Sequence, residues 1–211
     1  MRIDCTYEPE NTTSELETFE WDNPWWEQAP DTKKTRVLYI GDSISYGIRR
    51  HATEISENTL LFDNFSTSKA LDNPYFADSL ALFAKQERYR SVVLFNNGLH
   101  GFHLNDSLFE RYYRKMIVYL KESFRNIPIM VVLSTTVGDT ERRACIIRRN
   151  AIAQKIANEN GLDVIDLFEA SERMTELQTA DLVHFNEEGF HALAKIVVDA
   201  VKTHLSAKVN K

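Results

Sequence analysis

The sequence predicts a three-layer α/β fold, in which helices cover both faces of a five-stranded parallel sheet. Five short apolar runs rich in β-branched residues recur along the chain, as is typical of strands that are buried on both faces. Longer stretches with apolar residues at three- and four-residue spacing lie between several of them, which is the pattern of amphipathic helices. Strands that alternate with such helices imply right-handed βαβ crossovers and a parallel sheet. We find no repeat and no low-complexity linker, and therefore expect one α/β domain.

The predicted elements follow an N-terminal arm. Residues 1–34 hold several acids and no strong periodicity, so we expect an arm that packs on a domain spanning residues 35–211. The predicted strands are Val37–Ile40, Leu60–Phe65, Val92–Phe95, Ile129–Leu133 and Val164–Leu167. The predicted helices are Ala77–Arg88, Leu108–Phe124, Arg142–Asn158, which stops before Asn160-Gly161, and Glu188–Leu205.

Three tryptophans, Trp21, Trp25 and Trp26, cluster around Pro24 in the arm. Their rings have two uses, either to pack the arm against the domain or to stack on a sugar ring. We favour packing, because tryptophan near a chain terminus usually ties the terminus down.

The charge balance argues against a nucleic-acid partner. The 211 residues include 25 Lys and Arg against 31 Asp and Glu, for a net charge of −6. Phosphate contacts need clustered Lys and Arg, whereas Arg49-Arg50, Arg142-Arg143 and Arg148-Arg149 are short pairs. We interpret these pairs as solvated helix faces.

The cysteines, the N-terminus and the histidine spacing indicate a simple cytoplasmic protein. Cys5 and Cys145 cannot build a disulfide framework or a zinc site, so free thiols in a reducing compartment are expected. The N-terminus lacks the apolar core of a signal peptide, although a leader removed beforehand would leave the same sequence. No stretch approaches the ~18 apolar residues of a membrane span. Neither His-Glu-x-x-His nor a glycine-rich phosphate loop is present, so we expect no metal and no cofactor.

Polar residues follow each predicted strand, and this places them at one edge of the sheet. Ligands of open parallel sheets bind beyond the carboxyl ends of the strands. The residues at these ends are Gly41-Asp42-Ser43, Ser66-Thr67-Ser68-Lys69, Asn96 to Gly101, Ser134-Thr135-Thr136, and Asp181 with His184. Chance placement would rarely gather five such sets.

Ser43, His184 and Asp181 are the candidate catalytic residues at this edge. Serine is a weak nucleophile until a base takes its proton, and the base needs a third group that fixes its tautomer. Asp181 and His184, three residues apart, can lie on one face of a turn and so form that pair. No Gly-x-Ser-x-Gly elbow surrounds Ser43, which disfavours an α/β-hydrolase arrangement.

The tetrahedral intermediate of such a reaction also needs hydrogen-bond donors for its oxyanion. The Ser43 amide can supply one, and a backbone amide after the second strand another. A side-chain amide of Asn96 or Asn97 can supply a third.

Ile40-Gly41-Asp42-Ser43-Ile44-Ser45 and Asp181-Leu182-Val183-His184-Phe185-Asn186 resemble the first and last sequence blocks of the SGNH, or GDSL, hydrolase superfamily. The resemblance runs from about residue 36 to 205. It implies a flavodoxin-like sheet of five parallel strands between helices. It also implies Ser43 as nucleophile, His184 as base and Asp181 as its orienting partner.

The middle blocks depart from the family pattern. The second block usually ends in a glycine whose amide enters the oxyanion hole, and here Lys69 stands in that place, with Ser68 as the alternative. The third block usually reads Gly-x-Asn-Asp. Asn96 fits its donor position, which leaves Asn97 and His100 as substrate-binding residues. An offset register would instead put His100 in the donor position, and we favour Asn96 because an amide donates at any pH.

The sequence therefore predicts a serine esterase that hydrolyses small O-acyl esters, with an acetyl ester on a carbohydrate as the leading substrate, through an acyl-enzyme. A lysophospholipase or thioesterase is the alternative among enzymes. A non-catalytic binding module on the same fold is the alternative outside them, and a flavodoxin-like nucleotide binder is disfavoured by the missing phosphate loop.

Overall fold

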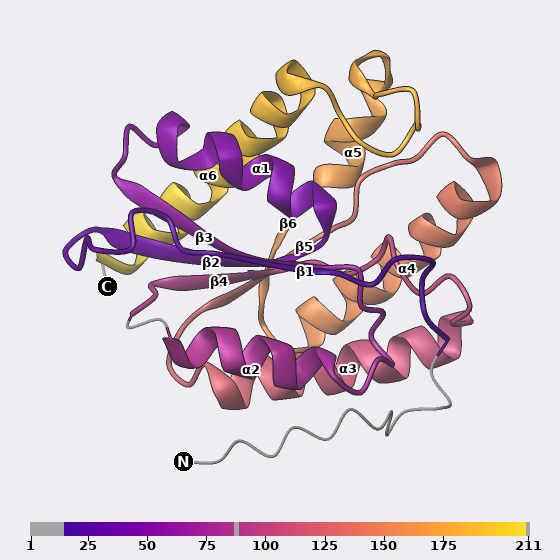
Figure 1. The fold of residues 1–211 in the computed structure, drawn as a ribbon, viewed down its shortest axis with the longest axis horizontal. Helices are drawn as coiled ribbons and strands as arrows, with labels where there is room; N and C mark the ends of the chain where they lie inside the picture. Colours follow the sequence, from indigo (N-terminus) through magenta and orange to yellow (C-terminus); the bar gives the residue numbers. More distant parts are fainter. Residues whose placement is uncertain (1–14, 87–88, 210–211) are drawn as a thin grey trace.

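The computed structural model describes residues 15–86 and 89–209, in which strands and helices alternate (Figure 1). The strands are β1 (Asp22–Trp25), β2 (Thr35–Gly41), β3 (Leu60–Thr67), β4 (Val92–Phe95), β5 (Ile129–Val132) and β6 (Asp163–Ile165). The helices are α1 (Ser43–Ile55), α2 (Phe76–Gln86), α3 (Asp106–Ser123), α4 (Thr140–Glu159), α5 (Leu167–Glu172), the short 3₁₀ helix η1 (Thr175–Leu177) and α6 (Glu187–Val209). The predicted α/β class is confirmed.

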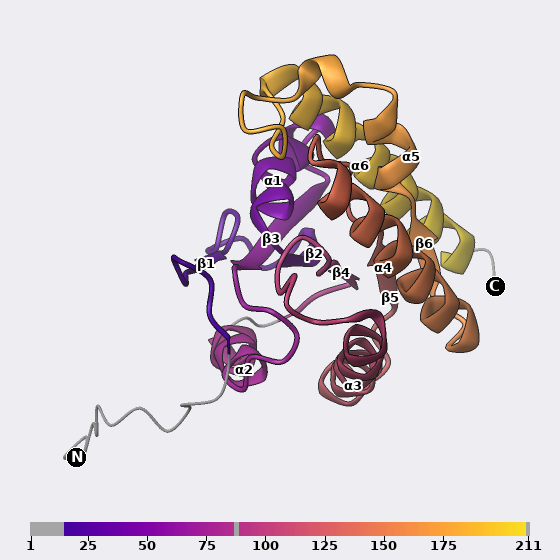
Figure 2. The same ribbon diagram turned by 90° about the vertical axis from the view of Figure 1, so that its right-hand side faces the viewer.

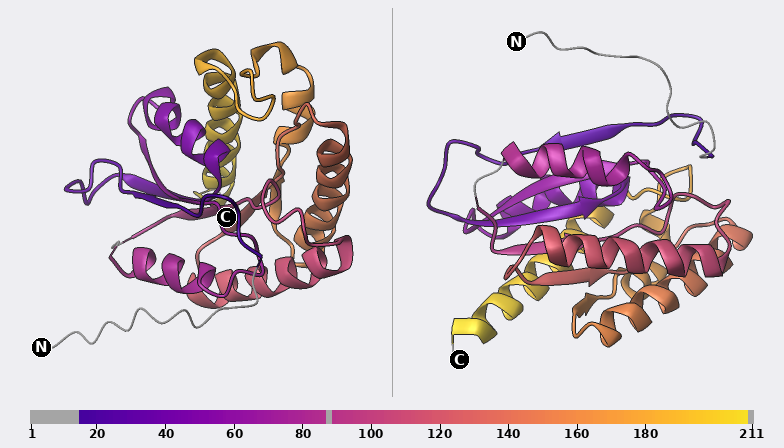
Figure 3. Two further views of the ribbon diagram at one scale, coloured as in Figure 1. Left: turned by 45° about the vertical axis from the view of Figure 1, so that its right-hand side comes forward. Right: turned by 90° about the horizontal axis from the view of Figure 1, so that it is seen from below.

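The sheet has six strands in the order β1-β3-β2-β4-β5-β6 (Figure 2), one more than predicted. The five strands from β2 to β6 run parallel, as expected. The additional strand, β1, lies within the predicted arm and pairs antiparallel with β3 at the edge of the sheet (Figure 3). Its sequence, Asp-Asn-Pro-Trp, shows no apolar alternation and contains a proline, which only an edge strand tolerates.

Side chains of successive strand residues enter two separate cores. Val37 and Tyr39 of β2 face one core together with residues of α1, α5 and α6. Leu38 and Ile40 face the other core with residues of α2, α3 and α4. The three layers of Figure 1 follow from this alternation, because each face of a buried strand needs its own helical cover.

Helix α1 was absent from the predicted elements. Its apolar residues Ile44, Ile48 and Ala52 lie four residues apart and are buried, and Asp42 supplies an N-cap side chain. These signals indicate a helix, but Gly47 weakens the pattern. That glycine serves packing, since a Cβ there would lie 2.2 Å from the Phe190 ring of α6.

Four of the five predicted strands have different bounds in the structure, and two of these differences have a clear cause. The last strand was expected at Val164–Leu167, yet β6 ends at Ile165, since the Asp166 side chain accepts a hydrogen bond from the Glu169 amide and caps α5. Strand β3 runs on to Thr67, because β1 gives its last residues a pairing partner. Ser66 and Thr67, which were predicted to follow this strand, therefore belong to it, and only Ser68 and Lys69 of that polar set come after it.

Some predictions concern residues that lie outside the described ones: residues 1–14 of the arm with Cys5, and the Arg88 end of the second helix. Cys145 is a free thiol. None of the helices in residues 15–86 and 89–209 combines the length and the apolar character that a membrane crossing requires.

Candidate active site

The carboxyl end of β2 leads directly into α1, and this junction holds Ser43 at the edge of the sheet. The buried Asp42 side chain caps the helix by accepting a hydrogen bond from the Ile44 amide at 2.9 Å. Burial raises the pKa of the Asp42 carboxyl group, although nearby imidazoles of His100 and His184 and the cap hydrogen bonds act in the opposite direction. Ser43 itself is half-buried and is the first residue of the helix.

A chain of two hydrogen bonds joins Ser43, His184 and Asp181. His184 Nε2 lies 2.7 Å from Ser43 Oγ, and His184 Nδ1 lies 2.6 Å from Asp181 Oδ2. The serine and the histidine are 141 positions apart in the chain. The structure thus brings together the three residues predicted to be catalytic, in the order that nucleophile activation requires.

The other oxygen of Asp181 fixes the carboxylate in this orientation. Asp181 Oδ1 accepts hydrogen bonds from the Val183 amide at 2.9 Å, the His184 amide at 3.0 Å and the Thr179 hydroxyl at 2.8 Å. Partial desolvation raises the pKa of Asp181, but the hydrogen bonds from His184, Val183 and Thr179 outweigh it and hold the pKa well below its ordinary value. Asp181 is therefore an ionised acceptor for the His184 ring.

The asparagines after β4 connect neighbouring loops. Asn96 Nδ2 donates to the Val132 carbonyl at 2.8 Å and contacts Ser134 Oγ at 3.1 Å, so both of its hydrogens have acceptors. Asn97 Nδ2 donates to the Lys69 carbonyl at 3.0 Å. Asn96 thus ties β4 to β5, and Asn97 ties the loop after β4 to the loop after β3.

The backbone hydrogen bonds after β3 decide which of Ser68 and Lys69 is the better candidate oxyanion donor. The Ser68 amide donates to the Trp21 carbonyl at 3.1 Å and continues the pairing with β1. The Lys69 amide donates to the hydroxyl of Thr67 at 3.0 Å, and its ammonium group lies 2.7 Å from Asp22 Oδ1. Because a hydroxyl contact is more easily exchanged than a sheet hydrogen bond, Lys69 is the better candidate donor of the two.

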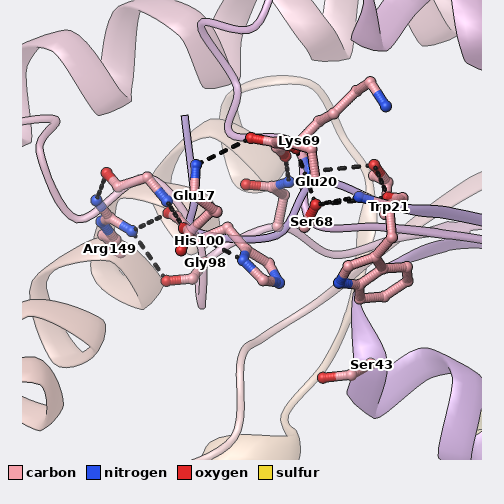
Figure 4. A network of polar contacts seen from close by, with 12 residues as sticks. Glu17, Glu20, Trp21, Ser43, Ser68, Lys69, Gly98, His100 and Arg149 are labelled. Atoms are coloured by element: carbon pink, nitrogen blue, oxygen red, sulfur yellow. Dashed lines mark hydrogen bonds and ion pairs between the residues drawn. The ribbon is translucent and has the colours of Figure 1, made fainter. Parts of the chain in front are cut away.

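The loop after β4 is held by Arg149, which is 1% exposed. Its guanidinium donates to the carbonyls of Gly98 at 3.0 Å, His100 at 2.7 Å and Gly101 at 2.6 Å (Figure 4). Gly101 adopts a φ of +65°, which glycine reaches without strain. These bonds define the backbone position of His100.

The prediction that Arg148-Arg149 belongs to a solvated helix face is wrong for Arg149. Its neighbours on the same face of α4, Ile146 and Ala153, are buried, and spacing of three and four residues relates all three. This spacing could have indicated from the sequence that Arg149 is buried. Arg148 fits the prediction, with a side chain that is 54% exposed. The prediction is also wrong for Arg49, which is 6% exposed.

His100 lies between two residues of the N-terminal segment. Its Nδ1 is 3.4 Å from Glu17 Oε1, which also accepts the Gly101 amide at 3.2 Å. The His100 hydrogen bond is the largest effect on the pKa of Glu17, which is lowered. The Trp21 ring meets the His100 ring edge-on, with centroids 6.4 Å apart. Neither Glu17 nor Trp21 was assigned to the site from the sequence.

No metal-binding arrangement stands beside these residues. Among the side chains of the described part of the chain, no three His, Cys, Asp or Glu residues gather in a way that could hold a metal ion.

Solved structures with the same fold include several hydrolases. An acetyl xylan esterase has 21% sequence identity and a TM-score of 0.62, over 79% of this chain and 99% of that chain. The catalytic domain of a Streptococcus pneumoniae peptidoglycan O-acetyltransferase has 14% identity and a TM-score of 0.64, over 82% and 96%. A candidate SGNH hydrolase from Slackia heliotrinireducens has 14% identity and a TM-score of 0.63, over 80% and 100%. No protein-family model and no curated protein matches the sequence. The chain therefore has the fold of the SGNH and GDSL hydrolases.

Proposed function

We propose that this chain, which has the SGNH hydrolase fold, is a serine esterase that removes small acyl groups, chiefly acetyl, from oxygen. The observation that carries the proposal is the hydrogen-bonded series Ser43–His184–Asp181 at the carboxyl edge of the sheet. We assign this activity to the domain of residues 35–211.

The geometry supports a two-step reaction through an acyl-enzyme. As Ser43 Oγ attacks the ester carbonyl, His184 Nε2 takes the hydroxyl proton, and the Asp181 carboxylate stabilises the imidazolium that forms. The tetrahedral intermediate collapses, the alcohol leaves with the proton from His184, and Ser43 is left acylated. Water then attacks the acyl group with His184 again as base, which releases the carboxylic acid and restores the serine.

We propose the amides of Ser43 and Lys69 as oxyanion donors. As the first residue of α1, Ser43 has an amide with no acceptor within the helix, and the Lys69 amide gains a stronger acceptor when it leaves the Thr67 hydroxyl. Asn96 joins them only if it exchanges its longer contact, to Ser134 Oγ, for the substrate. Each such donor is typically worth about 3–4 kcal/mol of transition-state stabilisation.

Two of the structures with this fold support an acetyl group on a carbohydrate. One is described as an acetyl xylan esterase and the other as a peptidoglycan O-acetyltransferase. Both descriptions combine an acetyl group with a carbohydrate-containing polymer, xylan in one and peptidoglycan in the other.

Hydrolysis of p-nitrophenyl acetate tests the proposal. We expect turnover with an initial burst, and recovery of a peptide acetylated on Ser43 after acid quenching and mass spectrometry. Absence of both turnover and acetylated Ser43, across acyl esters of increasing length, would instead favour a binding module on this fold.

The pH dependence of kcat/KM should show the protonation of one group, His184, as the pH decreases. Protonated His184 cannot accept the Ser43 proton, so kcat/KM should fall as the pH decreases. Because the pKa of Asp181 is lowered, that carboxylate stays ionised while His184 gains its proton. Log kcat/KM should therefore fall with a slope of about 1 per pH unit. A flat profile between about pH 5 and 8 would contradict the role of His184 as base.

A further inference from the structure

The three tryptophans of the N-terminal segment have different surroundings. The Arg49 guanidinium lies 4.2 Å from the centroid of the Trp25 ring, and Trp26 stacks on Phe83 with centroids 4.7 Å apart. Both rings are therefore used in packing. Trp21 is half-buried, and His100 is its one aromatic partner among the described residues, in a T-shaped pair, with no ring or cation stacked on the indole.

Two hydrogen bonds to Ser68, the residue after β3, hold the backbone of Trp21 in place. Its carbonyl accepts the Ser68 amide at 3.1 Å, and its amide donates to Ser68 Oγ at 2.8 Å (Figure 4). The neighbouring pair of β3 and β2 aligns Ser66 with Gly41, two residues before Ser43. Trp21 thus stands at the same edge of the sheet as the nucleophile, and Figure 4 shows its indole on the Ser43 side of the network.

Within the described part of the chain, one nitrogen of the His100 ring, Nε2, has no hydrogen-bond partner. The ionised Glu17 carboxylate can only accept, so in the neutral imidazole the hydrogen lies on Nδ1 and Nε2 carries a lone pair. Figure 4 shows Nε2 turned away from Glu17 toward the Trp21 side. The imidazoles of His100 and His184 both lie near enough to buried Asp42 to influence its pKa, which places them around the residue before Ser43.

A lone pair at Nε2 decides between two roles for His100. An oxyanion needs donors, so a neutral His100 held in this tautomer does not serve it, and the offset register considered from the sequence is disfavoured. The same lone pair accepts a hydrogen bond from a hydroxyl group. An acceptor of this kind beside an indole ring matches the two features of a sugar ring, its hydroxyl groups and its apolar face.

We propose that Trp21 and His100 form a binding wall for the alcohol part of the ester, and that this alcohol is a sugar ring, which stacks on Trp21 and donates a hydroxyl hydrogen to His100 Nε2. The proposal rests on the esterase function proposed above. Glu17 acts on this wall as a positioning residue, because it orients the His100 ring and the loop amide of Gly101.

Three acetyl esters separate the parts of this wall: ethyl acetate, cyclohexyl acetate, and a methyl pyranoside with one acetyl group. The second adds a ring to the first, and the third adds hydroxyl groups to the ring. Trp21→Ala should lower kcat/KM for both ring esters by about tenfold and leave ethyl acetate unchanged, and His100→Ala should lower only the pyranoside ester, by about the same factor.

The chain supplies matched controls for both variants. Trp25→Ala removes a tryptophan of the same segment, and His103→Ala removes an imidazole of the same loop that pairs with Asp72 at 2.9 Å. Neither should change the preference among the three esters. Trp21→Phe should restore ring-ester activity, since it keeps an aromatic face. Glu17→Ala should lower only the pyranoside rate, and Glu17→Gln should recover part of it, because its carbonyl oxygen still accepts from Nδ1.

Two results would contradict the proposed sugar-binding wall without contradicting the proposed esterase activity. Equal losses on all three esters would mean that His100 acts at the reacting carbonyl, and unchanged rates in both alanine variants would mean that the alcohol lies elsewhere. A binding measurement tests the wall even if the protein shows no esterase activity. Methyl pyranoside should quench tryptophan fluorescence in the Ser43→Ala protein. The quenching should vanish with Trp21→Ala but persist with Trp25→Ala, and its persistence in the Trp21 variant would reject the site.

Discussion

Replacement of Ser43 by alanine is expected to lower kcat for p-nitrophenyl acetate by on the order of 10⁴- to 10⁶-fold, since loss of a serine nucleophile removes the covalent step altogether. The residual rate would come from oxyanion donors and substrate binding alone. The fold should persist, because the lost hydroxyl is half-buried and its hydrogen bond joins only His184. Burst kinetics together with thermal unfolding would measure both effects.

Ser45→Ala is the matched control for this prediction. Ser45 lies two residues further along the helix, and its hydroxyl is buried, donating to the Asp42 carbonyl at 2.7 Å and accepting from Asn64 Nδ2 at 3.1 Å. Its loss should reduce stability by roughly 1–2 kcal/mol, as is typical for a buried hydrogen bond, and leave turnover within about tenfold. If turnover instead depends on Ser45 and survives Ser43→Ala, the assignment of the nucleophile is wrong.

Asp181→Asn is expected to lower kcat by roughly 10³- to 10⁴-fold while the loop keeps its shape, because it reverses the tautomer of His184. Three donors converge on Oδ1, from Thr179, Val183 and His184. The asparagine oxygen must therefore stay there, and its NH₂ group takes the place of Oδ2 beside His184 Nδ1. Nδ1 becomes an acceptor, Nε2 carries the hydrogen, and Ser43 loses its base.

A second histidine–aspartate pair provides the control for this variant. His204 Nδ1 lies 2.5 Å from Asp163 Oδ2, at the amino end of β6 and far along α6. Asp163→Asn makes the same chemical change away from the edge where Ser43 lies, and should leave kcat unchanged. Equal activity of Asp181→Asn and the intact protein would show that His184 does not depend on Asp181 for its tautomer.

The strands were predictable because burial on both faces leaves a continuous apolar run in the local sequence. Val92–Phe95 has the same bounds in the structure as in the prediction. β1 lacks such a run, because backbone pairing with β3, rather than burial of its own side chains on both faces, holds it in the sheet. α1 carries the cap and the spacing of a helix, but Gly47 is explained only by Phe190, which belongs to α6.

The candidate site divides in the same way. Ser43, Asp181 and His184 could be named from short motifs and from the rule that parallel strands end at one edge. The contribution of the N-terminal segment could not be named, because the contact of Glu17 with Gly101 spans 84 positions and follows no local pattern. Arg149 was misassigned for a related reason, since the four carbonyls that accept its hydrogen bonds belong to residues 45 to 51 positions earlier in the chain.

By itself, the sequence determined the fold class, the parallel direction of the core strands and which residues at the sheet edge are candidates for catalysis, because periodicity and strand ends are properties of neighbouring residues. Only the tertiary structure decided which polar groups are free to act. Asn96 has its amide hydrogens engaged by Val132 and Ser134, whereas no described residue bonds to Nε2 of His100, beside Trp21. Whether a polar group is already hydrogen-bonded or free to bind a substrate depends on which distant segments pack against it. Those contacts form only in the folded structure, so the local sequence does not reveal them.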